Sequence, residues 1–229
     1  MKEIKKKCLT VCILVCALLL AGMAAGSDFG YTESRTTYAD SQDSYQELLN
    51  IENAVATVSR DYIHTGDPII PADDLTVILD GQTLSPEQDY QIVGSSDNVS
   101  AGKGSIEIQG VGDYTGILQC TFTILPAKAG IKYLNTVKKN GKAKMTVKML
   151  CPPEGCGADT YKIRYRIKGS SKWKMTTCAT QKKVIKKLNP KKNYQVQVRA
   201  FTVIDGVTYA GEWSKAATSK MWSKVWVIN

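Results

Sequence analysis

The sequence is short of the residue that most general-base and nucleophilic catalysis uses. It contains one histidine, His64, in 229 residues, so a Ser-His-Asp triad or a Cys-His pair would have to use that single side chain. The surrounding Tyr-Ile-His-Thr-Gly segment indicates a turn on the surface. We therefore assign no residue to catalysis and expect that the chain is not an enzyme.

Ligand sets for metals and cofactors are also missing. Four of the seven cysteines follow residue 26, and none of them forms a C-x2-C pair, which argues against a structural zinc site. The aspartates match no EF-hand loop. The glycine-rich stretch 110–116 joins strand to strand, so no helix N-terminus is present to make it a phosphate-binding loop. We expect neither a metal nor a cofactor.

Long hydrophobic runs are absent after the first 26 residues. Residues 1–7 are lysine-rich, 8–20 are apolar and 21–26 are mostly small, which is the order of a secretory signal peptide cleaved before Ser27. An uncleaved membrane anchor is the alternative, although the apolar run is short for a span of roughly 20 residues. We expect a secreted or cell-surface protein with no integral membrane segment after cleavage.

Each half of the remaining chain is poor in charges of one sign. Residues 27–127 contain 16 acidic and 3 basic side chains, a net charge of −13, whereas residues 128–229 contain 4 acidic and 23 basic ones, a net charge of +19. This asymmetry predicts separate partners for the halves, or self-association through them, within one chain or head to tail between chains.

An exported chain can form disulfides. Cys120 shares a strand face with apolar residues, so we expect a buried free thiol there. Cys151–Cys156 and Cys156–Cys178 are both reachable pairings. The turn-forming residues 152–155 favour Cys151–Cys156, which would fix the shape of an exposed loop.

The acidic half divides into a leader and a β-rich module. Residues 27–53 are polar without a sustained period and are expected to form a flexible acidic leader. Short strands with turn signals follow over 54–127, including Asp80-Gly81 as a hairpin turn. The expected strands are 54–58, 75–79, 90–93, 105–109 and one that carries Leu118, Cys120, Phe122 and Ile124 on one face.

Several motifs of this module resemble a repeat of exported Firmicutes surface proteins. They are Asp80-Gly81, Asp89-Tyr90, Asn98, Gly102, 108–116 and Phe122-Thr123-Ile124. The resemblance is to an Ig-like or mucin-binding-like (MBG-like) β-module, and it implies a bacterial spacer or adhesion unit. Gly94 and Ser95 depart from the pattern, which has an aromatic residue after the Asp-Tyr strand.

In the basic half, apolar and polar residues alternate along the expected strands, as they do in a β-sandwich. Residues 161–168 alternate apolar with basic side chains, and residues 194–200 alternate apolar with polar ones, so each strand has one buried and one solvated face. Seven short strands in this half predict a β-sandwich over 128–222, followed by a C-terminal tail, 223–229.

This half resembles a fibronectin type III domain. Leu188, Pro190 and Tyr194 match its tyrosine-corner segment, in which the tyrosine hydroxyl bonds to upstream backbone. Residues 211–214, Gly-Glu-Trp-Ser, also follow the pattern. The tryptophan of the second strand is absent, and Thr146-Val147-Lys148 occupies that region. The resemblance implies a scaffold that contacts protein or polysaccharide.

The outward side chains of the two alternating strands predict a flat cationic face. Such a face attracts an anionic cell-wall polymer, a glycan or a surface protein, with an affinity that falls as salt rises. Nucleic acid is not an expected partner, since no recognition motif is present. A merely solubilising face is the alternative. The residues of the predicted face are Lys162, Arg164, Arg166, Lys168, Lys172, Lys174 and Arg199.

The sequence therefore predicts an all-β protein with two small β-sandwich-like modules in tandem after a signal peptide and a leader. The expected function is non-catalytic binding or spacing at the cell envelope. The alternatives are a structural subunit that self-associates through its acidic and basic halves, and an accessory subunit of a secreted enzyme.

Overall fold

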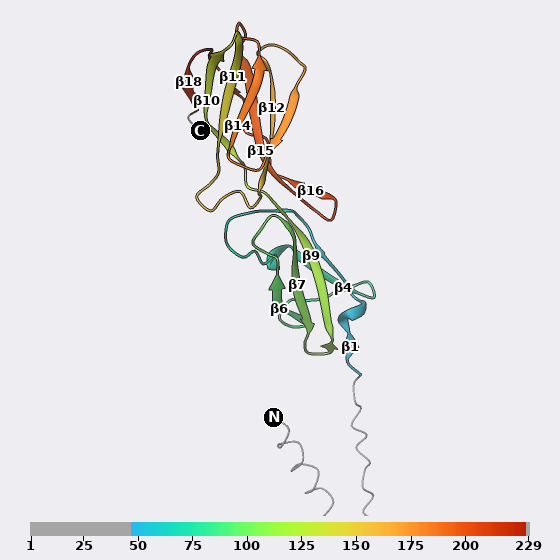
Figure 1. Cartoon of the computed structure of the whole chain (residues 1–229). Coiled ribbons are helices and arrows are strands. Elements are labelled where there is room, and N and C mark those ends of the chain that lie inside the picture. Colours follow the sequence, from blue (N-terminus) through green and yellow to red (C-terminus); the bar gives the residue numbers. More distant parts are fainter. Residues whose placement is uncertain (1–46, 228–229) are drawn as a thin grey trace, which may run out of the picture. The chain divides into compact units, whose positions relative to one another are not determined.

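A computed structural model describes residues 47–227 of the chain, and these residues are nearly all β (Figure 1). The all-β prediction is confirmed. The expected signal peptide and most of the expected leader lie outside the described residues. Within residues 47–227, no helix is long and apolar enough to cross a membrane.

The described part of the acidic half, residues 47–127, contains nine strands and two short 3-10 helices. Three strands form the sheet β2-β4-β5, four form the sheet β3-β9-β7-β6, and β1 pairs with β8. The elements are β1 Leu49–Asn50, η2 Ile51–Asn53, β2 Val55–Val58, β3 Tyr62–Ile63, η3 Ala72–Asp74, β4 Leu75–Leu79, β5 Gln82–Thr83, β6 Tyr90–Ser96, β7 Gly102–Gly110, β8 Tyr114–Thr115 and β9 Ile117–Leu125.

The core of this half lies along the alternating residues of β7 and β9. Ile106 and Ile108 on β7 pair with Cys120 and Leu118 on β9, and the first three of these side chains are buried. Ile51 joins the same core and is fully buried. Residues 49–53, which the sequence placed in a flexible leader, therefore belong to the folded part of the chain.

The basic half forms two antiparallel sheets that enclose one core. The sheets are β14-β11-β10-β18 and β13-β12-β15-β16, with β17 pairing with β15. The strands are β10 Gly130–Lys139, β11 Lys142–Leu150, β12 Thr160–Ile167, β13 Lys174–Cys178, β14 Lys182–Leu188, β15 Tyr194–Ile204, β16 Val207–Ala210, β17 Ala217–Thr218 and β18 Lys224–Trp226.

Inward side chains from both sheets fill this core. Met145 and Val147 come from one sheet, and Ile163, Val196 and Val198 come from the other; all five are fully buried. This is the arrangement that the period-two patterns predicted, because alternate residues of a strand point to opposite faces.

The C-terminal segment also joins the sheet. The sequence placed 223–229 in a tail beyond the sandwich, but β18 pairs with β10, with Trp226 opposite Tyr133. The two rings pack edge to face with centroids 5.3 Å apart, and the ammonium group of Lys224 lies 4.4 Å from the Tyr133 ring centroid. These aromatic contacts attach a strand of only three residues to the sheet edge.

The tyrosine corner forms as the sequence predicted. The backbone N–H of Asn189 donates a hydrogen bond of 2.9 Å to the hydroxyl of Tyr194. The Tyr194 side chain is buried in the core of the basic half. The bond therefore fixes the connection between β14 and β15 to the start of β15.

The cysteines follow the favoured prediction. Cys151 and Cys156 form a disulfide with a Cα–Cα distance of 5.6 Å, which closes the loop after β11. Cys120 is a buried free thiol, and Cys178 is a half-buried one. Cys178 lies opposite Tyr161 on β12. The alternative Cys156–Cys178 pairing is not formed.

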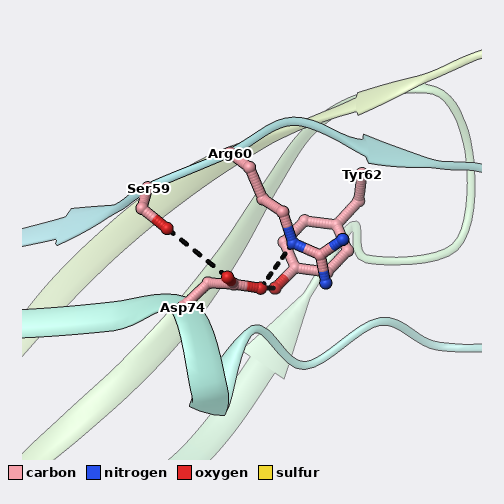
Figure 2. Close-up of polar contacts among 4 residues, drawn as sticks. All are labelled: Ser59, Arg60, Tyr62 and Asp74. Atoms are coloured by element: carbon pink, nitrogen blue, oxygen red, sulfur yellow. Dashed lines mark hydrogen bonds and ion pairs between the residues drawn. The ribbon is translucent and has the colours of Figure 1, made fainter.

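A polar cluster ties η3 to the segment that joins β2 to β3 (Figure 2). Asp74 accepts a hydrogen bond from the Tyr62 hydroxyl and a 2.6 Å bond from Nε of Arg60. The Arg60 guanidinium also lies 4.7 Å from the Tyr62 ring centroid. The hydrogen bonds from Tyr62 and Arg60 lower the pKa of the Asp74 carboxyl below its ordinary value.

The lowered pKa of Asp74 predicts an acid-dependent contribution to stability. That contribution is fully present above the unfolded-state pKa, about 3.9, and is lost as the pH falls through the lower folded-state pKa. We expect D74N to melt at a lower temperature than wild type at neutral pH. The difference should shrink below about pH 4, because the unfolded-state carboxyl takes up a proton there and the folded-state carboxyl follows at lower pH.

Melting curves followed by circular dichroism across a pH series measure this effect. D73N is the matched control, because Asp73 is the exposed neighbour in η3 and makes no hydrogen bond through its side chain in the described structure. A melting-temperature difference between D74N and wild type that stays constant down to the lowest pH would contradict the assignment.

The cysteines predict a defined order of alkylation. Burial raises the pKa of the Cys120 and Cys178 thiols, and the thiolate is the reactive form. We expect both to react slowly with iodoacetamide at neutral pH and faster in alkali, with the half-buried Cys178 ahead of Cys120. Peptide mass spectrometry should find Cys151 and Cys156 modified only after reduction, and their labelling before reduction would refute the disulfide.

Candidate binding face

The outer face of the β12–β15 pair carries the centre of the predicted cationic face. Lys162 lies opposite Arg199, while Arg164 and Arg166 lie opposite Gln197 and Gln195. Residues paired across antiparallel strands share one face of a sheet. The structure thus brings four of the seven predicted residues, Lys162, Arg164, Arg166 and Arg199, onto one surface of two neighbouring strands.

Two tryptophans complete this surface. The Trp173 ring centroid lies 4.3 Å from the Arg166 guanidinium and 4.8 Å from that of Arg164. The Trp213 ring centroid lies 4.4 Å from the Arg164 guanidinium and 4.7 Å from that of Arg199. Each ring is shared by two guanidiniums, and Arg164 contacts both rings. We call Arg166, Trp173, Arg164, Trp213 and Arg199 the arginine–tryptophan ladder.

Two glutamines orient the ladder. Nε of Arg164 donates to Oε1 of Gln197 at 2.9 Å, and Nε of Arg166 donates to Oε1 of Gln195 at 3.0 Å. Gln197 in turn donates from Nε2 to the carbonyl oxygen of Ser214, which follows Trp213. The strand that supplies the glutamines therefore also holds the loop that carries one of the rings.

No carboxylate neutralises the ladder within residues 47–227. The ion pairs of this part of the chain are Arg60–Asp74 and Lys128–Glu212, and neither involves a ladder residue. Nε of Arg199 is buried and has no hydrogen-bond partner in the described structure. The guanidiniums are thus stabilised by aromatic faces and amide oxygens, both of which leave their full positive charge in place.

The other predicted residues lie elsewhere. Lys168 is exposed one residue beyond β12. Lys174 lies opposite Tyr165, whose ring packs against the core, so Lys174 is on the face of β13 turned toward the other sheet. Lys172 and Lys174 line a cavity instead of extending the flat face. The cationic surface is therefore divided in two.

This cavity has a volume of about 370 Å³ and lies between the ends of β12, β13 and β14. We call Lys172, Lys174, Lys186 and Lys187 the lysine pocket. Sequence reasoning missed Lys186 and Lys187. The sequence feature that could have revealed them is a pair of lysines between two apolar residues, Ile185 and Leu188. These two residues are three positions apart, and both are buried in the structure. The full lining is Tyr165, Arg166, Ile167, Ser170, Lys172, Lys174, Lys186, Lys187, Leu188 and Tyr194.

A larger cavity of about 790 Å³ lies beside the disulfide loop. Its lining includes the apolar residues Ala129, Leu150, Pro152 and Pro153. None of the residues predicted for binding lines it. The disulfide thus borders an exposed hollow whose lining also includes Lys128, which is paired with Glu212, and Lys215.

His64 is buried rather than exposed on a turn, which corrects the sequence interpretation. Its Nδ1 lies 2.7 Å from the carbonyl oxygen of Val99. Burial fits a structural role, in which the ring nitrogen satisfies a backbone carbonyl. Among the described residues, no group of three or more His, Cys, Asp or Glu side chains is placed to hold a metal ion.

The likeness to known proteins comes from solved structures, of which 185 chains match this one. No protein-family model matches the chain, and no curated protein matches it. A solved structure described as a human fibronectin type III domain is 18% identical and covers 42% of this chain and 80% of that domain, with a TM-score of 0.32. A likeness of that degree says nothing of function. Nothing in these comparisons supports the resemblance of the acidic half to Firmicutes repeats.

The ladder predicts a specific loss of stability. We expect W213A to lower the free energy of unfolding by about 2 kcal/mol, because Arg164 and Arg199 lose their shared ring and its buried area. W222A is the control, since Trp222 is exposed and stacks on no cation in the described structure; its effect should stay below about 0.5 kcal/mol. Equal effects in urea denaturation would show that the ladder contributes nothing.

Proposed function

We propose that the protein is a non-catalytic extracellular binding protein whose arginine–tryptophan ladder contacts an anionic cell-wall polymer, a glycan or an acidic protein surface. The observation that carries this proposal is a row of three guanidiniums held in place without a neutralising carboxylate in the described structure. A merely solubilising surface does not need its cations to be fixed.

Stacking leaves the binding groups of arginine available. A guanidinium has five N–H donors in its plane, whereas a tryptophan ring covers only its face. In Arg164 and Arg166 the glutamines use only Nε. The terminal nitrogens remain for bidentate bonds to an anion. Because the rings and amides fix the side chains in advance, little rotamer entropy remains to be lost on binding.

An extracellular location is supported by the covalent chemistry of the chain. The Cys151–Cys156 disulfide is stable in the oxidising environment outside the cytosol. The lysine-rich and apolar N-terminal residues have the order of a secretory signal. Together they favour a protein that meets envelope polymers rather than cytosolic partners.

Self-association through the acidic and basic halves is a second candidate. The net charges of −13 for residues 27–127 and +19 for 128–229 favour it. The two ion pairs of the described residues each lie within one half, so these pairs do not use the opposite charges against each other. Sedimentation velocity across a salt series tests this candidate, which requires oligomers at low salt that dissociate as salt rises.

Binding to the ladder should depend on guanidinium geometry as well as charge. We expect R164S/R166S to weaken binding to heparin or to poly(glycerol phosphate) about tenfold at low salt. R164K/R166K should recover only part of the affinity, because lysine keeps the charge but loses the planar fork. Wild-type affinity should fall steeply with salt.

The charge-matched control is K138S/K142S, which removes two exposed lysines from the hairpin of the other sheet. Isothermal titration calorimetry at a temperature where circular dichroism shows all variants folded gives the affinities. Equal losses in R164S/R166S and in the control, or salt-independent binding, would refute the ladder as the contact surface.

A further inference from the structure

The lysine pocket depends on an irregularity in β14. Leu188 pairs with Ala143 and Ile185 pairs with Met145, so two residues of β14, Lys186 and Lys187, lie opposite a single residue of β11. This is a β-bulge. In a regular strand, residues three apart face opposite ways, but here Ile185 and Leu188 are both buried. The bulge therefore exposes two consecutive lysines at one end of the sandwich.

Lys187 has a backbone conformation that its side chain does not favour. Its φ is +60°, in the left-handed region that glycine and asparagine adopt far more readily. Glycine at this position would form the same bulge without strain. A lysine in such a position adds a charged side chain at a cost in backbone energy, and strain of this kind is concentrated at functional sites.

The pocket collects lysines from both sheets. β13 is the edge strand of one sheet and β14 is the edge strand of the other. Lys172 and Lys174 come from the β12–β13 side, and Lys186 and Lys187 come from β14. The cavity volume of about 370 Å³ lies within the range of small-ligand sites, roughly 300–1,000 Å³. Four lysines thus line one concave space.

No acidic residue lines this space, and a fifth cation, Arg166, also borders it. Like charges so gathered repel each other, and a bound anion removes that repulsion. Lysine ammonium groups are compact point charges that suit phosphate-like anions approached from several directions. The hydroxyl-bearing Ser170 adds a neutral donor to the lining.

We propose that the lysine pocket binds a tetrahedral oxyanion ester group, phosphate or sulfate, of the polymer that the ladder contacts. This inference rests on the proposed function, which supplies the polymer. Arg166 connects the two sites, because it lines the pocket and stacks on Trp173 of the ladder. The pocket holds one charged group of the polymer, and the ladder contacts the chain beside it.

The test compares two variants that each remove two positive charges. K186S/K187G empties one side of the pocket, and glycine at 187 relieves the left-handed backbone, so the fold is retained. K191S/K192S is the matched control, because these exposed lysines lie in the next turn and do not line the pocket. Calorimetry with poly(glycerol phosphate), heparin and polyglutamate measures all three proteins.

We expect K186S/K187G to weaken binding to a phosphate or sulfate polymer about tenfold, and K191S/K192S to weaken it less than about threefold. Pocket-dependent binding of poly(glycerol phosphate) alone identifies a phosphodiester polymer as the source. Pocket-dependent binding of heparin alone identifies a sulfated glycan. Polyglutamate that binds as tightly, with the same loss in K186S/K187G, would overturn the preference for oxyanion esters.

The outcomes separate this inference from the proposed function. If R164S/R166S loses polymer binding while K186S/K187G keeps it, the pocket is refuted and the ladder remains. If K186S/K187G loses binding while R164S/R166S keeps it, the pocket is supported and the ladder is refuted as the contact surface. If the wild-type protein binds neither poly(glycerol phosphate) nor heparin, the pocket proposal fails, and if it does not bind polyglutamate either, both proposals fail.

Discussion

The register between β12 and β15 determines both the core of the basic half and the surface above it. Ile163 pairs with Val198 on the buried face, and Lys162 pairs with Arg199 on the exposed face. A slip of one residue would turn the arginines inward and the core residues outward, because side chains alternate between faces. The burial of Ile163 and Val198 therefore fixes where the guanidiniums of the ladder lie.

Much of this arrangement could be predicted from the sequence because it follows from a period of two. The apolar residues of 161–165 and 194–200 are the ones that face the core, and Tyr194 forms the expected corner. The disulfide was predictable for a different reason, since the turn-forming residues between Cys151 and Cys156 bring the two close together.

The errors came from features that no period reveals. If β12 and β13 paired in equal steps from the turn at residues 169–171, Cys178 would lie opposite Lys162, but it pairs with Tyr161. That shift of one residue is enough to exchange the faces of β13, and it moves Lys174 from the flat surface to the pocket. Similarly, the bulge at Lys186 and Lys187 is a local backbone irregularity, and β18 is too short to show a pattern.

Arg166 belongs to two environments at once, since it borders the lysine pocket and lies 4.3 Å from the Trp173 ring centroid. The emission of an indole responds to the electric field of a charge so close to its ring. If the Arg166 guanidinium moves or its hydration changes, the fluorescence of Trp173 therefore changes, and no added label is needed. The ladder gives this molecule an intrinsic optical reporter of the state of its neighbouring cavity.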